Sequence, residues 1–463
     1  MKDELAFEYE HVLKKDKDKF KKALDFCEPY KKFMNESKTE RDAVRYIIDT
    51  AKKTGYINLY DAKNVKAGDK LYVNNRDKSV VLFTIGKESI DKGINFVISH
   101  IDSPRLDLKA NPLYEDTDIA YFKTHYYGGI RKYQWPTVPL AMHGRLFRED
   151  GSYIDFNIGE KEDDTRFYIT DLLPHLSKEQ DKRNLDEGIK GEELNIIVGS
   201  IPYLDKEDEE VKKEAKKQVK ENVLKILYDT YKIKEKDFVR AEIEFVPALH
   251  ATDIGFDRSL IAAYGQDDKV CAYPALISEI ENVNPVHTSC TVFTDKEEIG
   301  SDGNTGMVSE FLFDIVSDLC EMVNVNKSHV YRNSICLSSD VNSAYDPTFK
   351  SVFEERNSSY INRGVVLTKF TGHRGKSGSN DASAETMAKV IKLFDAKNVI
   401  WQTGELGIVD LGGGGTIAKY MANRNVDTVD VGVAVLSMHS PYELTSKLDI
   451  YETYLAYKAF LLN

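Results

Sequence analysis

The sequence predicts an α/β protein with a mostly parallel sheet, helices on both faces of that sheet, and an inserted β-rich domain. Apolar, strand-like runs alternate with helical patterns near both ends of the chain, which is typical of a parallel sheet covered by crossover helices. Between these parts the alternation stops, and strand and turn signals dominate. The expected main α/β domain therefore covers residues 1–105 and 248–463, and the expected insertion covers residues 106–247.

The first part of the chain is predicted to form helices and then strands. Apolar residues recur at helical spacing in residues 3–55, and Ser37-Lys-Thr-Glu40 resembles a capping box within that region. Strand-like runs follow at residues 70–73 and 79–86. A third apolar run begins at Ile94 and delivers His100 and Asp102 to a loop that Pro104 ends.

The insertion carries signals for hairpins and one charged helix. Asp150-Gly151 separates two strand-like runs, which indicates a β-hairpin. Residues 205–235 are rich in Lys and Glu with apolar residues at helical spacing, which favours an exposed amphipathic helix over an interaction tail. After the insertion, strands and helices alternate again. The last strand is expected over Val429–Ser440, and a helix over Leu444–Leu462 closes the chain.

Composition excludes several classes of protein. The 463 residues are 41% hydrophobic and 30% charged, as in a globular protein, and the net charge of -13 argues against nucleic acid as a partner. No apolar stretch reaches the roughly 18 residues that would predict a membrane-spanning helix. Residues 1–22 lack the apolar core of a secretory signal, and the five scattered cysteines are expected to be reduced thiols of a cytoplasmic protein.

Five apolar runs are each followed by residue types that bind metals: His100, Asp267, the pair Glu297 and Glu298, Asp340, and His439. The carboxyl ends of parallel strands share one edge of a sheet, so one edge could gather all five. Imidazoles and carboxylates together suit zinc or another borderline divalent ion. The set is too large for one tetrahedral catalytic ion, and it matches two ions about 3.5–4 Å apart that share a bridging carboxylate.

Each of these residues alone has an ordinary structural explanation. The histidines could be satisfied core residues, the aspartates could be helix N-caps, and Glu-Glu pairs usually lie on solvated helix faces. Their coincidence at five strand ends favours a metal site. Because adjacent residues leaving a strand point to different sides, Glu297 and Glu298 can differ in role, one binding a metal and the other handling a proton. The carboxylate of Asp102 can accept a hydrogen bond from the other ring N–H of His100 and so fix its tautomer.

Five motifs, in this order and spacing, resemble a known family over nearly the whole chain: His100-Ile-Asp102-Ser-Pro104, Gly265-Gln-Asp267-Asp268, Asp295-Lys-Glu297-Glu298-Ile-Gly-Ser301, Ser339-Asp340 and Ser437-Met-His439-Ser440. The family is that of aspartyl aminopeptidase and aminopeptidase I, which are dinuclear zinc exopeptidases. The resemblance implies a zinc exopeptidase-like fold and a metallo-aminopeptidase that removes the N-terminal residue from short peptides. It also implies two zinc ions per subunit, with cobalt or manganese as alternative ions.

The resemblance divides five ligands between two ions: His100 and Asp340 hold one, Glu298 and His439 hold the other, and Asp267 bridges both. It makes Glu297 the general base and places Asp102 behind the first histidine. In this family the inserted domain forms dimers that assemble into a hollow dodecamer, and one of its histidines reaches a neighbouring active site. Leu173-Pro-His175-Leu176 resembles that element, so His175 is the candidate, with an ordinary surface histidine as the alternative.

The chain departs from the aspartyl members of the family in its expected substrate pocket. Asp268 stands where those members tend to have asparagine, and Val341-Asn-Ser-Ala-Tyr-Asp346 replaces a histidine-rich stretch. The pocket for an acidic side chain therefore need not carry over. His373-Arg374-Gly-Lys376 offers cations, although such loops are more often only solvated. The glycine-rich run at 412–415 lacks a nucleotide-binding pattern and is expected to allow close approach of the backbone.

Three other functions remain open on sequence grounds. A related dinuclear amidohydrolase or deacylase would use the same ligands on a non-peptide amide. A glycosidase would use Glu297 and Asp340 as its acid and base and would need no metal. A non-catalytic relative would keep the fold alone, although the intact set of ligands argues against that alternative.

Overall fold

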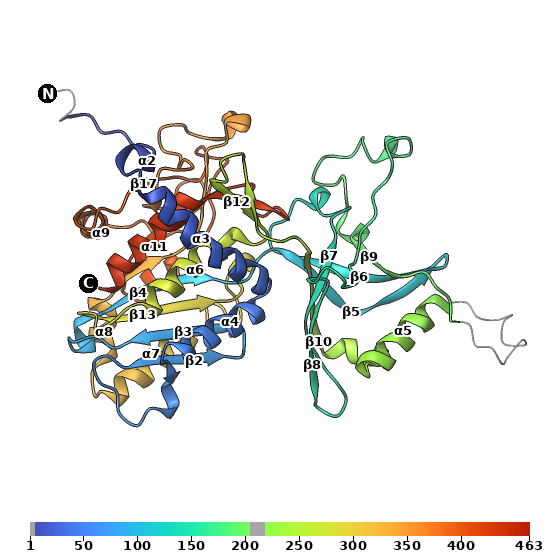
Figure 1. Cartoon of the computed structure of the whole chain (residues 1–463), viewed down its shortest axis with the longest axis horizontal. Coiled ribbons are helices and arrows are strands. Elements are labelled where there is room, and N and C mark those ends of the chain that lie inside the picture. Colours follow the sequence, from blue (N-terminus) through green and yellow to red (C-terminus); the bar gives the residue numbers. More distant parts are fainter. Residues whose placement is uncertain (1–4, 204–217) are drawn as a thin grey trace, which may run out of the picture. The chain divides into compact units, whose positions relative to one another are not determined.

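The structure is a computed structural model that describes residues 5–203 and 218–463. The chain divides into two compact units (Figure 1). The first comprises Met1–Ser103, His250–Met438 and Tyr442–Asn463, and the second comprises Pro104–Leu249 with His439–Pro441. Residues 204–217, where the predicted charged helix begins, lie outside the described residues.

The first unit is built around a nine-stranded sheet. In spatial order its strands are β1 (Ile57–Asn58), β2 (Lys70–Asn75), β3 (Ser79–Thr84), β13 (Thr288–Thr294), β4 (Ile94–His100), β14 (Ile335–Ser338), β18 (Asp427–Gly432), β16 (Val365–Thr368) and β17 (Trp401–Thr403). The four central strands, β13, β4, β14 and β18, pair in parallel. Their outer neighbours, β3 and β16, are antiparallel to them. The carboxyl ends of the central strands therefore share one edge.

Helices cover both faces of this sheet: α4 (Glu40–Lys53), α6 (Gln266–Ile280), α7 (Phe311–Met322), α8 (Lys327–Asn333), α9 (Ala384–Ala396), α10 (Ala418–Ala422) and α11 (Lys447–Leu461). The unit also contains α2 (Val12–Lys15) and α3 (Lys19–Glu36), and α3 packs against α11 and α6. Side chains alternate between the faces of a strand, so Val97 packs in the core with α4, α6, α9 and α11. Its neighbours Phe96 and Ile98 pack in the opposite core with α7, α8 and α10. The prediction of a mixed α/β protein is confirmed.

A second, five-stranded sheet in the same unit differs from the sequence prediction. Its spatial order is β11 (Thr252–Ile254), β12 (Leu260–Ala263), β20 (Glu443–Ser446), β19 (Ala434–Leu436) and β15 (Asn342–Ser343). The expected last strand is divided between β18 and β19, which belong to different sheets. The closing helix starts at Lys447, because Leu444–Ser446 pair with β12. Here pairing with a distant strand overrides the local helical pattern.

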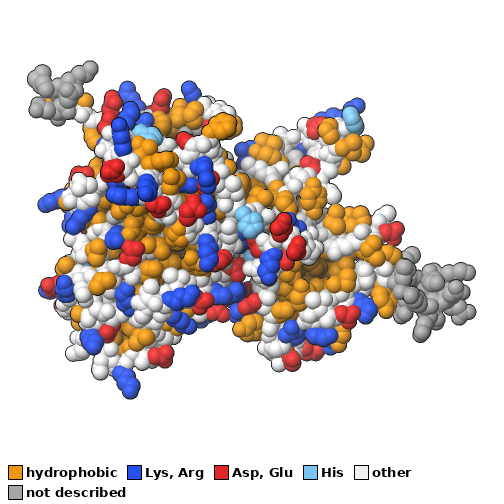
Figure 2. Space-filling view, in the orientation of Figure 1, with side chains coloured by type: hydrophobic (Ala, Val, Ile, Leu, Met, Phe, Trp, Pro, Cys, Tyr) orange, Lys and Arg blue, Asp and Glu red, His pale blue; other side chains and the backbone are white. Residues whose placement is uncertain are grey.

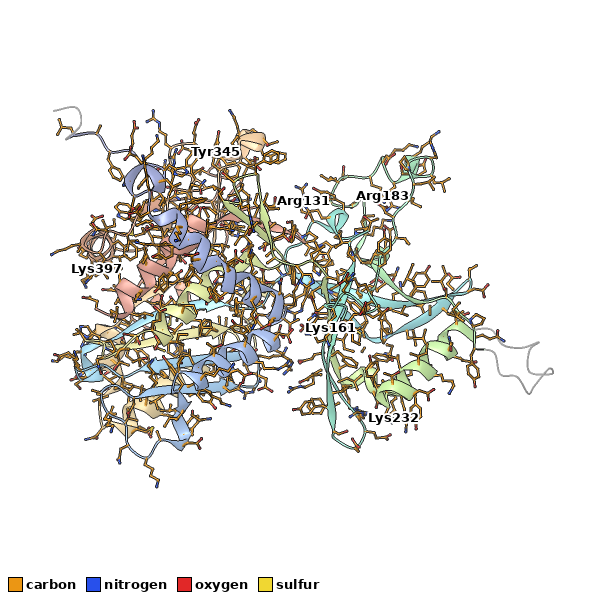
Figure 3. The ribbon with its side chains drawn as sticks, viewed as in Figure 1. Arg131, Lys161, Arg183, Lys232, Tyr345 and Lys397 are labelled. Atoms are coloured by element: carbon orange, nitrogen blue, oxygen red, sulfur yellow. The ribbon has the colours of Figure 1, made fainter. Side chains whose placement is uncertain are left out.

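The second unit contains a six-stranded antiparallel sheet. Its spatial order is β8 (Tyr153–Ile158), β7 (Leu140–Phe147), β10 (Ala241–Pro247), β5 (Arg105–Asp116), β6 (Ile119–Tyr127) and β9 (Asn195–Gly199), and α5 (Gln218–Tyr231) follows β9. The predicted hairpin at Asp150-Gly151 joins β7 to β8 and is confirmed. A long segment between β8 and β9 carries Arg183, which Figure 3 labels, and contains little regular structure.

The backbone packs closely at the glycine-rich run, residues 412–415. Gly413 has φ +111°, and a Cβ added to it would lie 1.9 Å from the carbonyl oxygen of Gly372. These glycines therefore permit close backbone approach, as predicted.

All five cysteines are buried and free of disulfides. Within the described ranges, none of the helices combines the length and the apolar character that crossing a membrane requires.

Candidate metal centre

Three parallel strands bring predicted ligands to one edge of the nine-stranded sheet. β4 ends at His100, and Thr294 at the end of β13 lies opposite it in the ladder. Glu297 and Glu298 follow β13 in a short 3-10 helix. Asp340 follows β14, and a Cβ added to Gly432 would lie 1.9 Å from its carbonyl oxygen. The missing side chain at that glycine therefore lets β18 approach the backbone of Asp340 closely.

The other two predicted ligands follow strands of the five-stranded sheet. Asp267 lies at the start of α6, just after β12, and His439 follows β19. The expectation that one sheet edge supplies all five is therefore wrong for these two, because β12 belongs to the smaller sheet and the chain leaves the nine-stranded sheet at Val433, before His439. His439 groups with the second unit, where its Nδ1 lies 2.9 Å from the carbonyl oxygen of Gly129. That contact favours a proton on Nδ1 and leaves Nε2 to bind a metal.

The predicted ligands that belong to the first unit lie close together. The Nε2 atom of His100 is 3.0 Å from Oδ1 of Asp267. One ligand atom from each of His100, Asp267 and Asp340 lies within 4.8 Å of the others, and Glu298 offers an oxygen within the same distance of Asp267. His100 and Asp267 are buried, whereas Asp340 and Glu298 are half-buried. Glu297 is adjacent, with Oε2 3.9 Å from Nε2 of His100.

The electrostatics of this cluster fit a bound cation. Burial, reinforced by the charges of Asp268 and Glu297, raises the pKa of Asp340 well above its ordinary value. Burial opposes a charge on His100, yet Asp102 and Asp267 raise the pKa of its imidazole well above the ordinary value. Both shifts arise because several carboxylates share a site with little water. A divalent ion would supply the positive charge that such a site lacks, and nitrogen and oxygen donors suit zinc.

Asp102 holds more of the site than the sequence indicated. The backbone N–H groups of Glu297 and Glu298 each donate to its carboxylate, at 3.2 Å in both cases. The Nδ1 atom of His100 lies 3.0 Å from the carbonyl oxygen of Asp102 and 3.3 Å from Oδ1. The contact with His100 is predicted by the sequence, whereas the two backbone contacts are not, because they join residues about 195 positions apart.

Asp102→Asn is expected to lower kcat/KM by about 10–100-fold, the usual cost of changing a group that supports a ligand. Asparagine keeps the shape but has one oxygen, so its NH₂ group would face one of the two backbone N–H groups. The 3-10 helix that carries the paired glutamates would then shift. Steady-state kinetics together with metal content test this, and unchanged kinetics would contradict the supporting role of Asp102.

Two further predictions concern His175 and the basic loop at residues 373–376. His175 is exposed in a turn of the second unit. In the basic loop, Lys376 is 2.9 Å from Asp381, which also pairs with Lys369. This carboxylate partly neutralises the cations that were considered for an acidic substrate side chain.

The fold and the cluster define the class as an α/β protein whose His and carboxylate side chains could hold a metal ion. The chain belongs to the family of aminopeptidase I zinc metalloproteases (M18), whose family model matches residues 33–461. It is 46% identical over 472 residues to a probable M18 family aminopeptidase 1 of Clostridium acetobutylicum, covering 100% of both chains. The protein is therefore a zinc-dependent aminopeptidase, and the predicted family and enzyme class are confirmed.

Solved structures agree with this assignment. The crystal structure of an M18 family aminopeptidase from Thermotoga maritima has a TM-score of 0.93 and 44% sequence identity, covering 98% of this chain and 99% of that one. The mApe1 dodecamer of S. cerevisiae has a TM-score of 0.74 and 21% identity, covering 96% and 97%. At that identity the second likeness concerns the fold alone.

Proposed function

We propose that the enzyme is a cytoplasmic aminopeptidase that removes the N-terminal residue from short peptides at a dinuclear zinc centre. His100 and Asp340 would hold one ion, Glu298 and His439 the other, and Asp267 both. The observation that carries the proposal is the close approach of the ligand atoms around Asp267, within 4.8 Å in the first unit. His439 directly follows Met438 of that unit in sequence, so its backbone is tethered to the same region.

The chain's own residues account for the proton transfers. Zinc, when bound, supplies the Lewis acidity that lowers the pKa of water and polarises a peptide carbonyl group. Glu297 lies beside the ligands, 3.9 Å from Nε2 of His100, and would take the proton of the attacking water. The same carboxyl group would then protonate the leaving amine. Asp102 keeps Glu297 in place by accepting its backbone N–H.

Metal content and activity test the proposal together. We expect two zinc ions per chain by mass spectrometry, and hydrolysis of aminoacyl-p-nitroanilides that stops on chelation and returns with zinc. The same panel of substrates, extended to N-acyl compounds, reports side-chain preference and tests the amidohydrolase alternative. A single ion per chain with full activity would contradict the dinuclear centre, and activity that survives chelation would contradict metal catalysis altogether.

We also propose that the β-rich domain, residues 106–247, mediates a homo-oligomer of dimers assembled into a dodecamer; a yeast protein of similar fold is described as a dodecamer. The segment around His175 supports an interface because it exposes large apolar side chains: Leu172 (51%), Leu173 (50%), Leu176 (66%) and Leu185 (59%). Figure 2 shows hydrophobic side chains gathered on the visible surface of this unit. Such patches mark protein interfaces. In the assembly, His175 would contact substrate in a neighbouring active site.

Light scattering on the wild type is expected to give about twelve times the mass of one chain, because exposed apolar segments such as this one form interfaces. Leu176→Asp would bury a charge there and should reduce the assembly to smaller species. Val239→Asp is the matched control, since Val239 is 59% exposed in the same unit but outside this segment. A monomeric wild type would contradict both the assembly and the role of His175.

A further inference from the structure

Lys269 is a buried cation close to the candidate bridging ligand, and no step proposed above uses it. Its exposed fraction is 0%, which is rare for lysine and costs free energy unless the ammonium group is well paired. It lies on the first helical turn of α6, two residues after Asp267. The Nζ atom is also 5.6 Å from the ring centre of Tyr264.

The ammonium group reaches the backbone of Asp267 through one hydroxyl. Nζ of Lys269 donates to Oγ of Ser103 at 2.5 Å, and that Oγ donates to the carbonyl oxygen of Asp267 at 2.7 Å. The direction of both bonds is fixed, because an ammonium group can only donate and a carbonyl oxygen can only accept. Ser103 is 2% exposed, so water competes little for either bond.

The backbone N–H of Asp267 is held as well. It donates to Oε2 of Glu443 at 3.2 Å, and Glu443 is 1% exposed. Both backbone polar groups of Asp267 are therefore bound by side chains that come from distant parts of the sequence. The residue itself has φ −73° and ψ 112°, outside the helical region, so the regular hydrogen bonds of α6 do not fix its conformation.

Gly265 makes room for this arrangement. A Cβ added to it would lie 2.6 Å from Nζ of Lys269 and 2.7 Å from Oγ of Ser103. Its φ of +71° is also unfavourable for residues with a side chain. The motif Gly265-Gln-Asp267-Asp268-Lys269 thus combines the proposed bridging ligand with the space that the Lys269 ammonium group needs.

We propose that Lys269 is a positioning residue, which acts through Ser103 to fix the backbone of Asp267 so that its carboxylate can bind two metal ions at once. The inference rests on the proposed dinuclear centre and adds a role within it. A bridging carboxylate must satisfy two ions simultaneously, so a small shift of its backbone weakens both bonds. Groups that orient ligands typically contribute about 10–100-fold to metal affinity.

A purely electrostatic role and a positioning role of Lys269 predict opposite changes in zinc affinity when this residue is replaced. Removing a nearby positive charge would by itself strengthen binding of a dication, because less repulsion remains. Releasing the backbone of Asp267 would weaken binding. The direction of the change in zinc affinity of Lys269→Met therefore distinguishes a positioning role from a purely electrostatic one.

The experiment is a zinc titration of the full-length metal-free enzyme against a chelating indicator, with the number of bound ions counted. We expect Lys269→Met and Ser103→Ala each to weaken at least one zinc site by about 10–100-fold. Ser103→Ala keeps the cation and removes only the hydroxyl relay, so it remains informative if Lys269→Met fails to fold. Ser103→Thr, which restores a hydroxyl, should recover most of the affinity.

Lys447→Met is the control for the loss of a buried cation. Lys447 is 1% exposed and pairs with Asp253 at 2.8 Å, and neither residue belongs to the metal site. The Lys447→Met substitution should lower the unfolding temperature without changing the zinc affinity. Two tight ions in wild type with unchanged or tighter zinc binding in Ser103→Ala would overturn the positioning role and leave the proposed function intact. Fewer than two ions in wild type would overturn the dinuclear proposal and this inference with it.

Discussion

Glu297→Gln is expected to lower kcat by about 10²–10⁴-fold while the enzyme keeps both zinc ions, because positioned acid–base groups contribute that much. Glutamine matches the shape of glutamate but cannot take a proton from water or return one to the leaving amine. The backbone N–H of residue 297 would still donate to Asp102, so the local structure should persist. Steady-state kinetics and metal analysis on the same sample measure both effects.

Glu298→Gln is the matched control, because it makes the same change at the neighbouring position. Both residues are half-buried, and both backbone N–H groups donate to Asp102. Because Glu298 is a proposed metal ligand, Glu298→Gln should lower the metal content as well as kcat. Loss of metal in Glu297→Gln with retention in Glu298→Gln would mean that the two roles are reversed.

Asp267→Asn is expected to bind fewer than two zinc ions and to lose more than about 10²-fold in kcat/KM, beyond the usual cost of changing a supporting group. An amide has one oxygen and no negative charge, so it cannot bridge two cations as a carboxylate does. The variant keeps the backbone that Ser103 and Glu443 hold. Metal content, measured with excess zinc present during preparation and then removed, gives the test.

Asp268→Asn provides the comparison for that prediction. The Asp268 side chain is buried, and its Oδ2 accepts from the backbone N–H of His100 at 3.3 Å, a bond that an amide oxygen can also accept. Burial raises the pKa of this carboxyl group well above its ordinary value. Since aspartyl members of the family tend to have asparagine here, the expected loss is less than about tenfold. Equal losses at positions 267 and 268 would contradict a special bridging role for Asp267.

Local sequence patterns determined a large part of this protein. The apolar run that begins at Ile94 and stops at Pro104 predicted both β4 and the presentation of His100, because strand formation depends on nearby residues. The same reasoning placed Glu297 and Asp340 just beyond their strands. The motifs around these residues also indicated the family, which the comparisons confirm.

Tertiary structure alone decided how those pieces meet. The sequence does not reveal that the expected last strand divides between two sheets, or that β20 forms where a helix was expected, since both depend on pairing with distant strands. The contacts of Asp102 with the paired glutamates, and of Lys269 with Ser103, likewise join residues more than 160 positions apart. Residue type and periodicity determine local structure and candidate ligands, whereas the partners that orient those ligands are fixed only when distant segments pack together.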